Sequence, residues 1–372
     1  MITIKKILGF TLLILLIFSI SDDAIAQRKQ KGYLKRKNKK ISKYRVGSIH
    51  FDKNKQYAAF AFGISSMNYF GDIAPQQSIA STDLKLTRPG FTVSHMWRFH
   101  QNMFLRSSFT WARVKGDDFK ANDPYDKDGG GAYRYVRNLH FRNDIKELSA
   151  IISWDIFSNH GTFLNRLRFT PYLFAGAGVF YHNPRAMAPD TDRNGNPLPD
   201  AGKYVSLEPL GTEGQYSSNH PEVKPYSKIQ FALPGGIGLR FLMNKRWDFE
   251  AEVGYRWMFF DYIDDISGEF IDLGALDGDL AKVMSDRSME QTAANVGEPR
   301  DFDAINSVAT VYTYTSLYDG NTYTTYAGYG HETDIGVQPN NRGGSSGNDV
   351  ILSLTFRVAY IITGSFKRAK FR

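Results

Sequence analysis

The sequence predicts an all-β protein: an eight-stranded antiparallel transmembrane β-barrel of an outer membrane, with short periplasmic turns and long extracellular loops. Three observations support this prediction. Eight segments alternate apolar and polar side chains with the period of a β-strand. Each segment is long enough for the ~9 to 11 residues with which a tilted strand crosses a bilayer. The links between the segments alternate between short and long, which is typical of outer-membrane barrels.

The alternation is clearest in four segments, at residues 145–157, 226–243, 247–260 and 349–363. In WDFEAEVGYRWMFF (247–260) every odd position is apolar, whereas the even positions include Asp248, Glu250, Glu252 and Arg256. The other four segments alternate less regularly and span about 57–68, 89–99, 102–115 and 168–181.

The links decide between a barrel and a soluble β-sandwich, which also has alternating strands but does not require one-sided loop lengths. Short turns follow the second, fourth and sixth segments. Long loops follow the other segments, at about residues 69–88, 116–137, 182–225 and 261–348. The predicted barrel therefore spans residues 57–363, and an even number of strands places both termini on the short-turn, periplasmic side.

The two faces of such a barrel meet different surroundings. Lipid contacts the outer face, because every main-chain polar group is paired between strands. The aromatic residues at the two ends of the seventh segment suit the interfacial girdles of the membrane: Trp247, Phe249, Trp257 and Phe259.

The interior is predicted to be a salt-bridged plug rather than a channel. An eight-stranded barrel is about wide enough for its side chains to fill it. The charges predicted to face inward nearly balance: Arg98, Arg106, Lys228, Arg240, Arg256 and Arg357 against Glu147, Asp155, Asp248, Glu250 and Glu252.

The N-terminus predicts a cleaved signal peptide over residues 1–26. Lys5 and Lys6 precede an apolar run at 7–20, and Ala24-Ile25-Ala26 has the small-x-small pattern of a cleavage site. An uncleaved anchor is the alternative, but this run is shorter than the ~20 residues of a spanning helix. The chain has no cysteine, which excludes disulfides, thiolate metal sites and a lipid-bearing cysteine.

The net charge of +8 is unevenly distributed. Residues 28–45 carry ten Lys or Arg and no acid, and the tail at 364–372 adds further bases, whereas residues 261–348 are acidic. The basic segment, within residues 27–56, is predicted to lie in the periplasm. There it would contact a partner protein or anionic lipid, or remain a solvated tail, and the compartment excludes nucleic acid. Its candidate partner-binding residues are Lys35, Arg36, Lys37, Lys39 and Lys40.

Few motifs point to chemistry. Asp190, Asp192 and Asn194 resemble the first half of a calcium loop, but position twelve is Ala201 rather than a bidentate glutamate, and a solvated turn is the alternative. Glycines near 176 and 235 precede no helix, so they indicate strand curvature rather than a phosphate site. None of the eight histidines lies in a recognisable nucleophile motif, so the sequence predicts no enzymatic activity and no cofactor.

Two shorter elements are predicted inside the last long loop. Residues 308–328 alternate threonine and tyrosine around Asp319-Gly320, which predicts a hairpin that continues the barrel wall. Residues 278–291 predict a short helix.

The chain resembles the PorG-like outer-membrane proteins of the type IX secretion and gliding apparatus over roughly residues 57–363. The segments that carry this resemblance are NYFGDIAP (68–75), LEPLGTEGQ (207–215), DYIDDISGEF (261–270), VMSDRSME (283–290) and NDVILSLTF (348–356). The resemblance implies a non-enzymatic barrel that links the outer membrane to a periplasmic ring of PorK-like and PorN-like proteins. The alternatives are an OmpA-like or OmpX-like structural or adhesive barrel and an outer-membrane lipid hydrolase.

Overall fold

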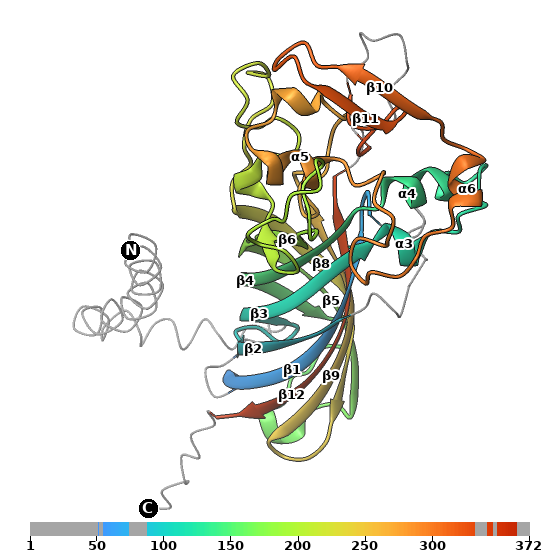
Figure 1. The fold of residues 1–372 in the computed structure, drawn as a ribbon. Helices are drawn as coiled ribbons and strands as arrows, with labels where there is room; N and C mark the ends of the chain where they lie inside the picture. Colours follow the sequence, from blue (N-terminus) through green and yellow to red (C-terminus); the bar gives the residue numbers. More distant parts are fainter. Residues whose placement is uncertain (1–50, 52–54, 74–87, 332–340, 345–347, 363–372) are drawn as a thin grey trace, which may run out of the picture. The chain divides into compact units, whose positions relative to one another are not determined.

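Eight long strands form one closed antiparallel barrel (Figure 1). The computed structural model describes residues 51, 55–73, 88–331, 341–344 and 348–362. The barrel strands are β1 (Tyr57–Phe70), β2 (Arg88–Arg98), β3 (Met103–Asp117), β4 (His140–Asp155), β5 (Phe169–Tyr181), β8 (Ile229–Leu242), β9 (Trp247–Met258) and β12 (Val350–Ile361). They pair in the order β3-β2-β1-β12-β9-β8-β5-β4, and the pairing of β3 with β4 closes the ring, as predicted.

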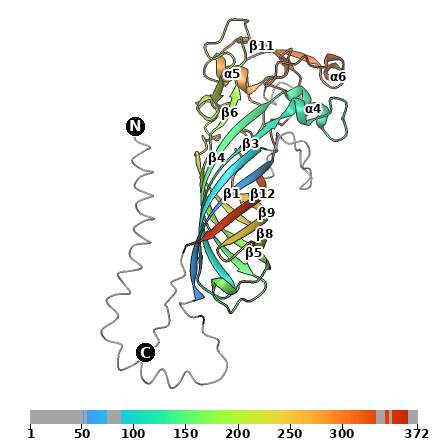
Figure 2. The same ribbon diagram turned by 90° about the horizontal axis from the view of Figure 1, so that it is seen from below.

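The remaining elements lie in the turns and loops between these strands. They are α3 (Asp118–Ala121), α4 (Gly131–Arg137), η3 (Phe163–Asn165), β6 (Pro184–Met187), β7 (Tyr204–Ser206), η4 (Glu208–Leu210), η5 (Leu273–Ala275), α5 (Asp279–Ser285), α6 (Phe302–Asn306), β10 (Val311–Thr315) and β11 (Thr322–Tyr326). Figures 1 and 2 show α4, α5, α6, β6 and β11 together at one end of the barrel. Within the described residues, no helix combines the length and apolar character needed to cross a membrane.

The barrel strands turn apolar side chains outward. In β1, Phe60, Phe62 and Ile64 are 53%, 59% and 60% exposed, whereas Ala59 and Ala61, which alternate with them, are buried. The aromatic residues of the seventh segment also face outward, with Trp247, Trp257 and Phe259 at 40%, 49% and 64% exposure. A soluble sandwich would bury these side chains in its core, so this orientation excludes the sandwich.

The interior is filled in layers. Near the short-turn end lies an apolar cluster that includes Tyr57, Phe104 and Phe163. At the long-loop end a second cluster includes Phe141 and Phe180. Charged side chains occupy the space between the two clusters.

The charged layer consists of ion pairs between strands, which confirms the predicted plug. Arg106 and Arg357 both pair with Glu252, and Arg357 and Arg240 both pair with Glu250. Farther along the barrel, Arg240 pairs with Asp155 and Arg256 with Glu147, at 3.0 and 2.6 Å. The prediction for Lys228 is wrong: it precedes β8 and pairs with Glu208 in a loop, 2.7 Å away.

The turn between β4 and β5 closes the short-turn end. Phe163 packs into the apolar cluster there. Arg166 pairs with Asp248 of β9 at 3.0 Å and donates to the main-chain oxygens of Lys245 and Asn244 at 3.1 and 3.0 Å. The barrel interior is therefore blocked from this end as well.

Gly238 shows why glycines lie within the strands. A Cβ atom at this position would come within 2.4 Å of the Tyr172 ring. The glycine leaves room for that ring inside the barrel, and it belongs to a strand rather than to a phosphate-binding loop.

Two predictions for the last loop have different outcomes. The helix appears as α5, shorter than predicted. The hairpin forms as β10 and β11, but the prediction that it continues the barrel wall is wrong, because the two strands make a separate two-stranded sheet.

Candidate functional site

The loops after β1, β3, β5 and β9 fold together at the long-loop end. We call their described residues the cap: 71–73, 118–139, 182–228, 259–331, 341–344 and 348–349. The cap has its own apolar core, in which Tyr135 of α4 packs with Phe270, Ile305 and Tyr329. A second cluster joins Leu273 and Leu276 to residues of the β10–β11 hairpin. The cap is thus a packed unit.

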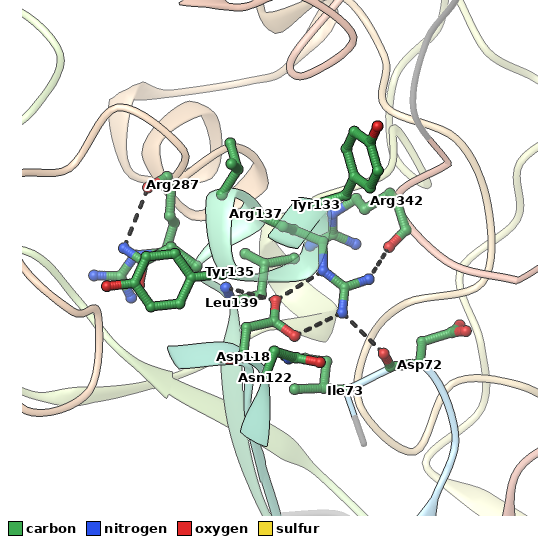
Figure 3. A network of polar contacts seen from close by, with 12 residues as sticks. Asp72, Ile73, Asp118, Asn122, Tyr133, Tyr135, Arg137, Leu139, Arg287 and Arg342 are labelled. Atoms are coloured by element: carbon green, nitrogen blue, oxygen red, sulfur yellow. Dashed lines mark hydrogen bonds and ion pairs between the residues drawn. The ribbon is translucent and has the colours of Figure 1, made fainter. Parts of the chain in front are cut away.

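An ion pair between Asp118 and Arg137 holds the loop between β3 and β4 (Figure 3). Two parallel hydrogen bonds of 2.8 Å join the guanidinium to the carboxylate, and Arg137 and Asp118 are 5% and 0% exposed, respectively. Asp118 also accepts the main-chain N–H of Leu139 at 3.0 Å. Burial alone would lower the pKa of Arg137, but attraction and hydrogen bonding to Asp118, together with attraction to Asp72 and Asp264, outweigh burial and raise the pKa above its usual range.

Arg137 also ties three loops together (Figure 3). It donates to the main-chain oxygen of Asp72, after β1, at 2.9 Å, and to that of Arg342, before β12. Arg300 binds the same loop from another direction and donates to the main-chain oxygens of Tyr135 and Val136 at 2.7 and 2.8 Å. Buried arginines therefore bond main-chain groups that would otherwise lack partners inside the cap.

Arg342 organises a second network. It pairs with Glu213 at 2.8 Å and donates to the main-chain oxygen of Asp265 at 2.8 Å. Thr212 donates to the Asp265 carboxylate at 2.5 Å and accepts the Ser285 hydroxyl on its main-chain oxygen at 2.6 Å. Burial raises the pKa of Asp265 to about 7.

Aspartates gather where the cap meets the barrel mouth. Asp264 accepts the main-chain N–H of Ile73 at 3.2 Å. Asp349 accepts the Tyr69 hydroxyl at 2.6 Å and the main-chain N–H of Ile263 at 2.8 Å. Burial raises the pKa of Asp349 to about 7.

The pKa values of two further carboxyls at the mouth are also raised. Burial, followed by repulsion from Asp349 and Asp72, raises the pKa of Asp261 to about 8 and that of Asp264 well above its ordinary value. These carboxyls therefore exchange protons at a much higher pH than exposed aspartates do.

The predicted calcium turn is closed by its own hydrogen bonds. Among the described residues, no group of three or more His, Asp or Glu side chains could hold a metal ion. Asp192 accepts the main-chain N–H groups of Asn194 and Asn196, each at 2.8 Å, and Asp190 accepts Leu198 through its main-chain oxygen. The 190–198 segment is thus a self-bonded turn.

Three histidines in and beside the cap bond main-chain groups. The Nε2 atom of His140 accepts from the Met187 N–H at 2.9 Å, and that of His331 accepts from Gly328 at 2.8 Å. His182 bonds the main-chain oxygen of Ser227 at 3.1 Å. These contacts fix loop conformation.

The structure brings together segments that are far apart in the chain. Hydrogen bonds link the five segments that carry the family resemblance: 283–290 to 207–215, 207–215 to 261–270, and 261–270 to both 68–75 and 348–356. All five therefore meet where the cap joins the barrel.

Some predicted residues lie outside the part of the chain that the structure describes, and some buried residues of the cap were not predicted. Lys35, Arg36, Lys37, Lys39 and Lys40 lie outside the described residues, as do residues 1–26 and 364–372. Sequence reasoning missed the buried cap residues Asp118, Arg137, Arg300 and Arg342, because they follow no periodic pattern.

A family model described as a domain of unknown function (DUF6089) matches residues 45–198. No match was found among curated proteins. Solved structures with a similar fold include Ail, the attachment invasion locus protein of Yersinia pestis, at 9% identity and a TM-score of 0.31, covering 83% of this chain and 99% of Ail. A major outer membrane protein of Thermus thermophilus is 10% identical with a TM-score of 0.34, covering 82% of this chain and 99% of its own. Neisserial surface protein A is 10% identical with a TM-score of 0.28, covering 82% and 95%.

Proposed function

We propose that this protein is an integral outer-membrane protein and a non-enzymatic component of the type IX secretion system. The apolar outer face of the barrel is the observation that supports the proposed location. Phe62, Phe231 and Ile237, on two different strands, are 59%, 65% and 60% exposed, and they belong to an apolar surface shared by all eight strands. Contiguous apolar surface on this scale marks contact with lipid or with another protein, and a closed barrel leaves no strand edge unpaired in lipid.

The filled interior argues against transport through the barrel. Ion pairs cross its centre, and the β4–β5 turn blocks the short-turn end. We therefore assign the function to the two ends of the molecule. With the long loops outside the cell, the cap is extracellular and both termini are periplasmic.

The secretion role is supported by the five segments that resemble PorG-like proteins. They are distant in sequence and yet bond one another in one assembly at the barrel mouth. Because the five segments form one hydrogen-bonded network, a change in one segment would disturb the others. The ion pairs and main-chain bonds within the cap fit an anchoring or assembly role.

The proposed partner is the periplasmic ring of PorK-like and PorN-like proteins. The basic segment supplies the contact, with Lys35, Arg36, Lys37, Lys39 and Lys40 at its centre. Ten positive charges in residues 28–45 favour an acidic surface, and their steering effect fades beyond the ~8 Å Debye length of physiological salt.

Replacing these five residues with glutamine is expected to leave barrel assembly intact but to weaken ring co-purification several-fold and reduce secretion. Half of the ten positive charges are removed, which weakens attraction to an acidic surface, while the barrel strands are unchanged. The measurement is recovery of ring proteins with the tagged barrel at low and high salt.

The matched control removes five positive charges elsewhere, by Lys120→Gln, Lys127→Gln, Lys203→Gln, Lys224→Gln and Lys245→Gln. This variant should retain the ring. Equal ring recovery by both variants and the wild type at every salt concentration would rule out docking through the basic segment.

The packed cap favours one second candidate, an adhesive OmpA-like or OmpX-like barrel. Its outermost hairpin exposes Leu317 at 78% and Val311 at 58%, which could serve a contact with another surface. Deletion of the gene distinguishes the candidates, because an adhesive barrel would leave type IX secretion unchanged.

A further inference from the structure

Charged side chains on the outside of the barrel are confined to one sector. Among the described residues of the eight barrel strands, this sector holds Arg113 and Lys115 of β3 and Arg142, Asp144 and Lys146 of β4. Arg185 of β6 lies opposite Arg142 of β4 in the strand pairing, and its side chain is exposed. We call Arg113, Lys115, Arg142, Lys146 and Arg185 the outer-wall basic patch.

The patch begins at the edge of the apolar surface. Strand pairing places Lys146 between Trp111 of β3 and Tyr181 of β5. The ring of Trp111 stacks on Phe91 of β2 with centroids 5.4 Å apart. On this sector, Phe109 and Leu148 come next toward the short-turn end, 39% and 42% exposed. Aromatic residues bordering an apolar surface are typical of the interface between lipid tails and headgroups.

The patch extends from this aromatic level toward the cap. Arg113 lies opposite Asp144, and Lys115 opposite Arg142, which in turn lies opposite Arg185. From Trp111 to Lys115 the strand rises about 13 Å. In an outer membrane this places the patch beside the headgroups of the outer leaflet.

Only part of this positive charge is neutralised within the described chain. Arg113 forms two hydrogen bonds to Asp144, of 2.6 and 2.9 Å. Lys115, Arg142, Lys146 and Arg185 form no ion pair with any carboxylate of the described residues. Asp144 also attracts Arg142 and Arg185 at longer range, and Asp117 attracts Lys115, but these two acids do not balance the five bases, so the patch stays positively charged.

Aromatic rings hold two of these four cations in place. The guanidinium of Arg142 lies 3.9 Å from the centre of the Tyr204 ring, and Tyr204 is fixed by a 3.0 Å hydrogen bond to Asn295. Lys146 lies 5.8 Å from the Tyr181 ring centre. Cations held over rings keep their charge available to an anion on the open side.

We propose that the outer-wall basic patch binds the phosphate groups of phosphorylated glycolipids in the outer leaflet. The inference rests on the proposed outer-membrane location, which supplies the lipid. The patch has the charge for phosphate, and the apolar surface next to it accommodates acyl chains of the same molecule. Arginine forks match phosphate oxygens, and lysines add point charges.

The test uses the full-length mature protein in detergent micelles with diphosphoryl lipid A, and counts retained lipid by native mass spectrometry. The variant is Lys115→Gln, Arg142→Gln, Lys146→Gln and Arg185→Gln. Loss of four basic side chains is expected to lower lipid retention on the order of a thousandfold. The matched control, Lys127→Gln, Lys203→Gln, Lys224→Gln and Lys245→Gln, removes the same charge elsewhere and should retain lipid as the wild type does.

Two further arms identify the ligand. Lipid A stripped of its phosphates should be retained poorly by the wild type, and inorganic phosphate at the concentration of the lipid should not displace diphosphoryl lipid A. Equal retention of stripped lipid, displacement by inorganic phosphate, or equal retention by the patch variant would each overturn the proposal.

Folding is checked separately by the change in gel mobility on boiling. If the fourfold variant does not fold, the pair Lys115→Gln and Lys146→Gln is measured in its place, with a smaller loss expected. A wild type that fails to insert into lipid nanodiscs would refute the membrane location and this proposal with it. Insertion with no preference for phosphorylated lipid would refute this proposal alone.

Discussion

The Asp118→Asn variant is expected to lose the folded cap while keeping the barrel. Asparagine preserves the size of the side chain but leaves the Arg137 guanidinium, 5% exposed, without its counter-ion. Breaking a buried ion pair from one side costs about 3 to 5 kcal/mol. Proteolysis in increasing urea measures the effect: cap cleavage should begin at lower urea, whereas the change in gel mobility on boiling should persist.

A natural control exists on the outer wall. Asp144 binds Arg113 with the same two-bond geometry, but the two side chains are 37% and 34% exposed. Because exposed pairs contribute about 0 to 1 kcal/mol, Asp144→Asn should hardly change cap proteolysis. Equal effects of the two variants would mean that Asp118 is not buried as described.

The Glu252→Gln variant is expected to destabilise the barrel itself. Glu252 pairs with both Arg106 and Arg357 and accepts the Tyr172 hydroxyl at 2.7 Å. Among the described residues, loss of its charge leaves Arg106 without an ion-pair partner and leaves Arg357 only Glu250, which Arg240 also binds. Because this variant also removes one partner of a buried ion pair, we expect the free energy of unfolding to fall by about 3 to 5 kcal/mol. The temperature at which unboiled protein loses its folded gel mobility should fall clearly.

Tyr172→Phe provides a graded comparison at the same site. It removes one hydrogen bond to Glu252 and leaves the ion pairs, so it should cost about 1 kcal/mol. If Glu252→Gln proves no more damaging than Tyr172→Phe, the charged layer does not stabilise the barrel.

The barrel could be predicted from the sequence because strand periodicity is local. Where outward positions are apolar, as in β9 and β12, the predicted segments agree closely with the strands. The predicted start of β4, at residue 145, is too late, because the strand begins at His140. There the outward positions are Arg142 and Asp144, so the apolar row ends while pairing with β3 continues. Arg142, which departs from the apolar pattern, belongs to the outer-wall basic patch.

The cap could not be predicted in the same way. Its contacts join residues with no periodic relation, such as Arg342 with Glu213 and Arg137 with Asp118. The alternation and turn predict the β10–β11 hairpin, but its separation from the barrel wall depends on packing against Leu273 and Leu276. The prediction for Lys228 fails because its partner, Glu208, lies in another part of the long loop.

Cysteine labelling tests most directly whether the barrel spans the outer membrane with its cap outside the cell. The chain has no cysteine, so each introduced thiol is the only one present. Leu317→Cys places it on the cap, where Leu317 is 78% exposed, and Lys245→Cys places it in the exposed turn between β8 and β9. In intact cells a membrane-impermeant maleimide should label Leu317→Cys and spare Lys245→Cys until the outer membrane is permeabilised. Labelling of Lys245→Cys in intact cells, or protection of Leu317→Cys there, would contradict the account.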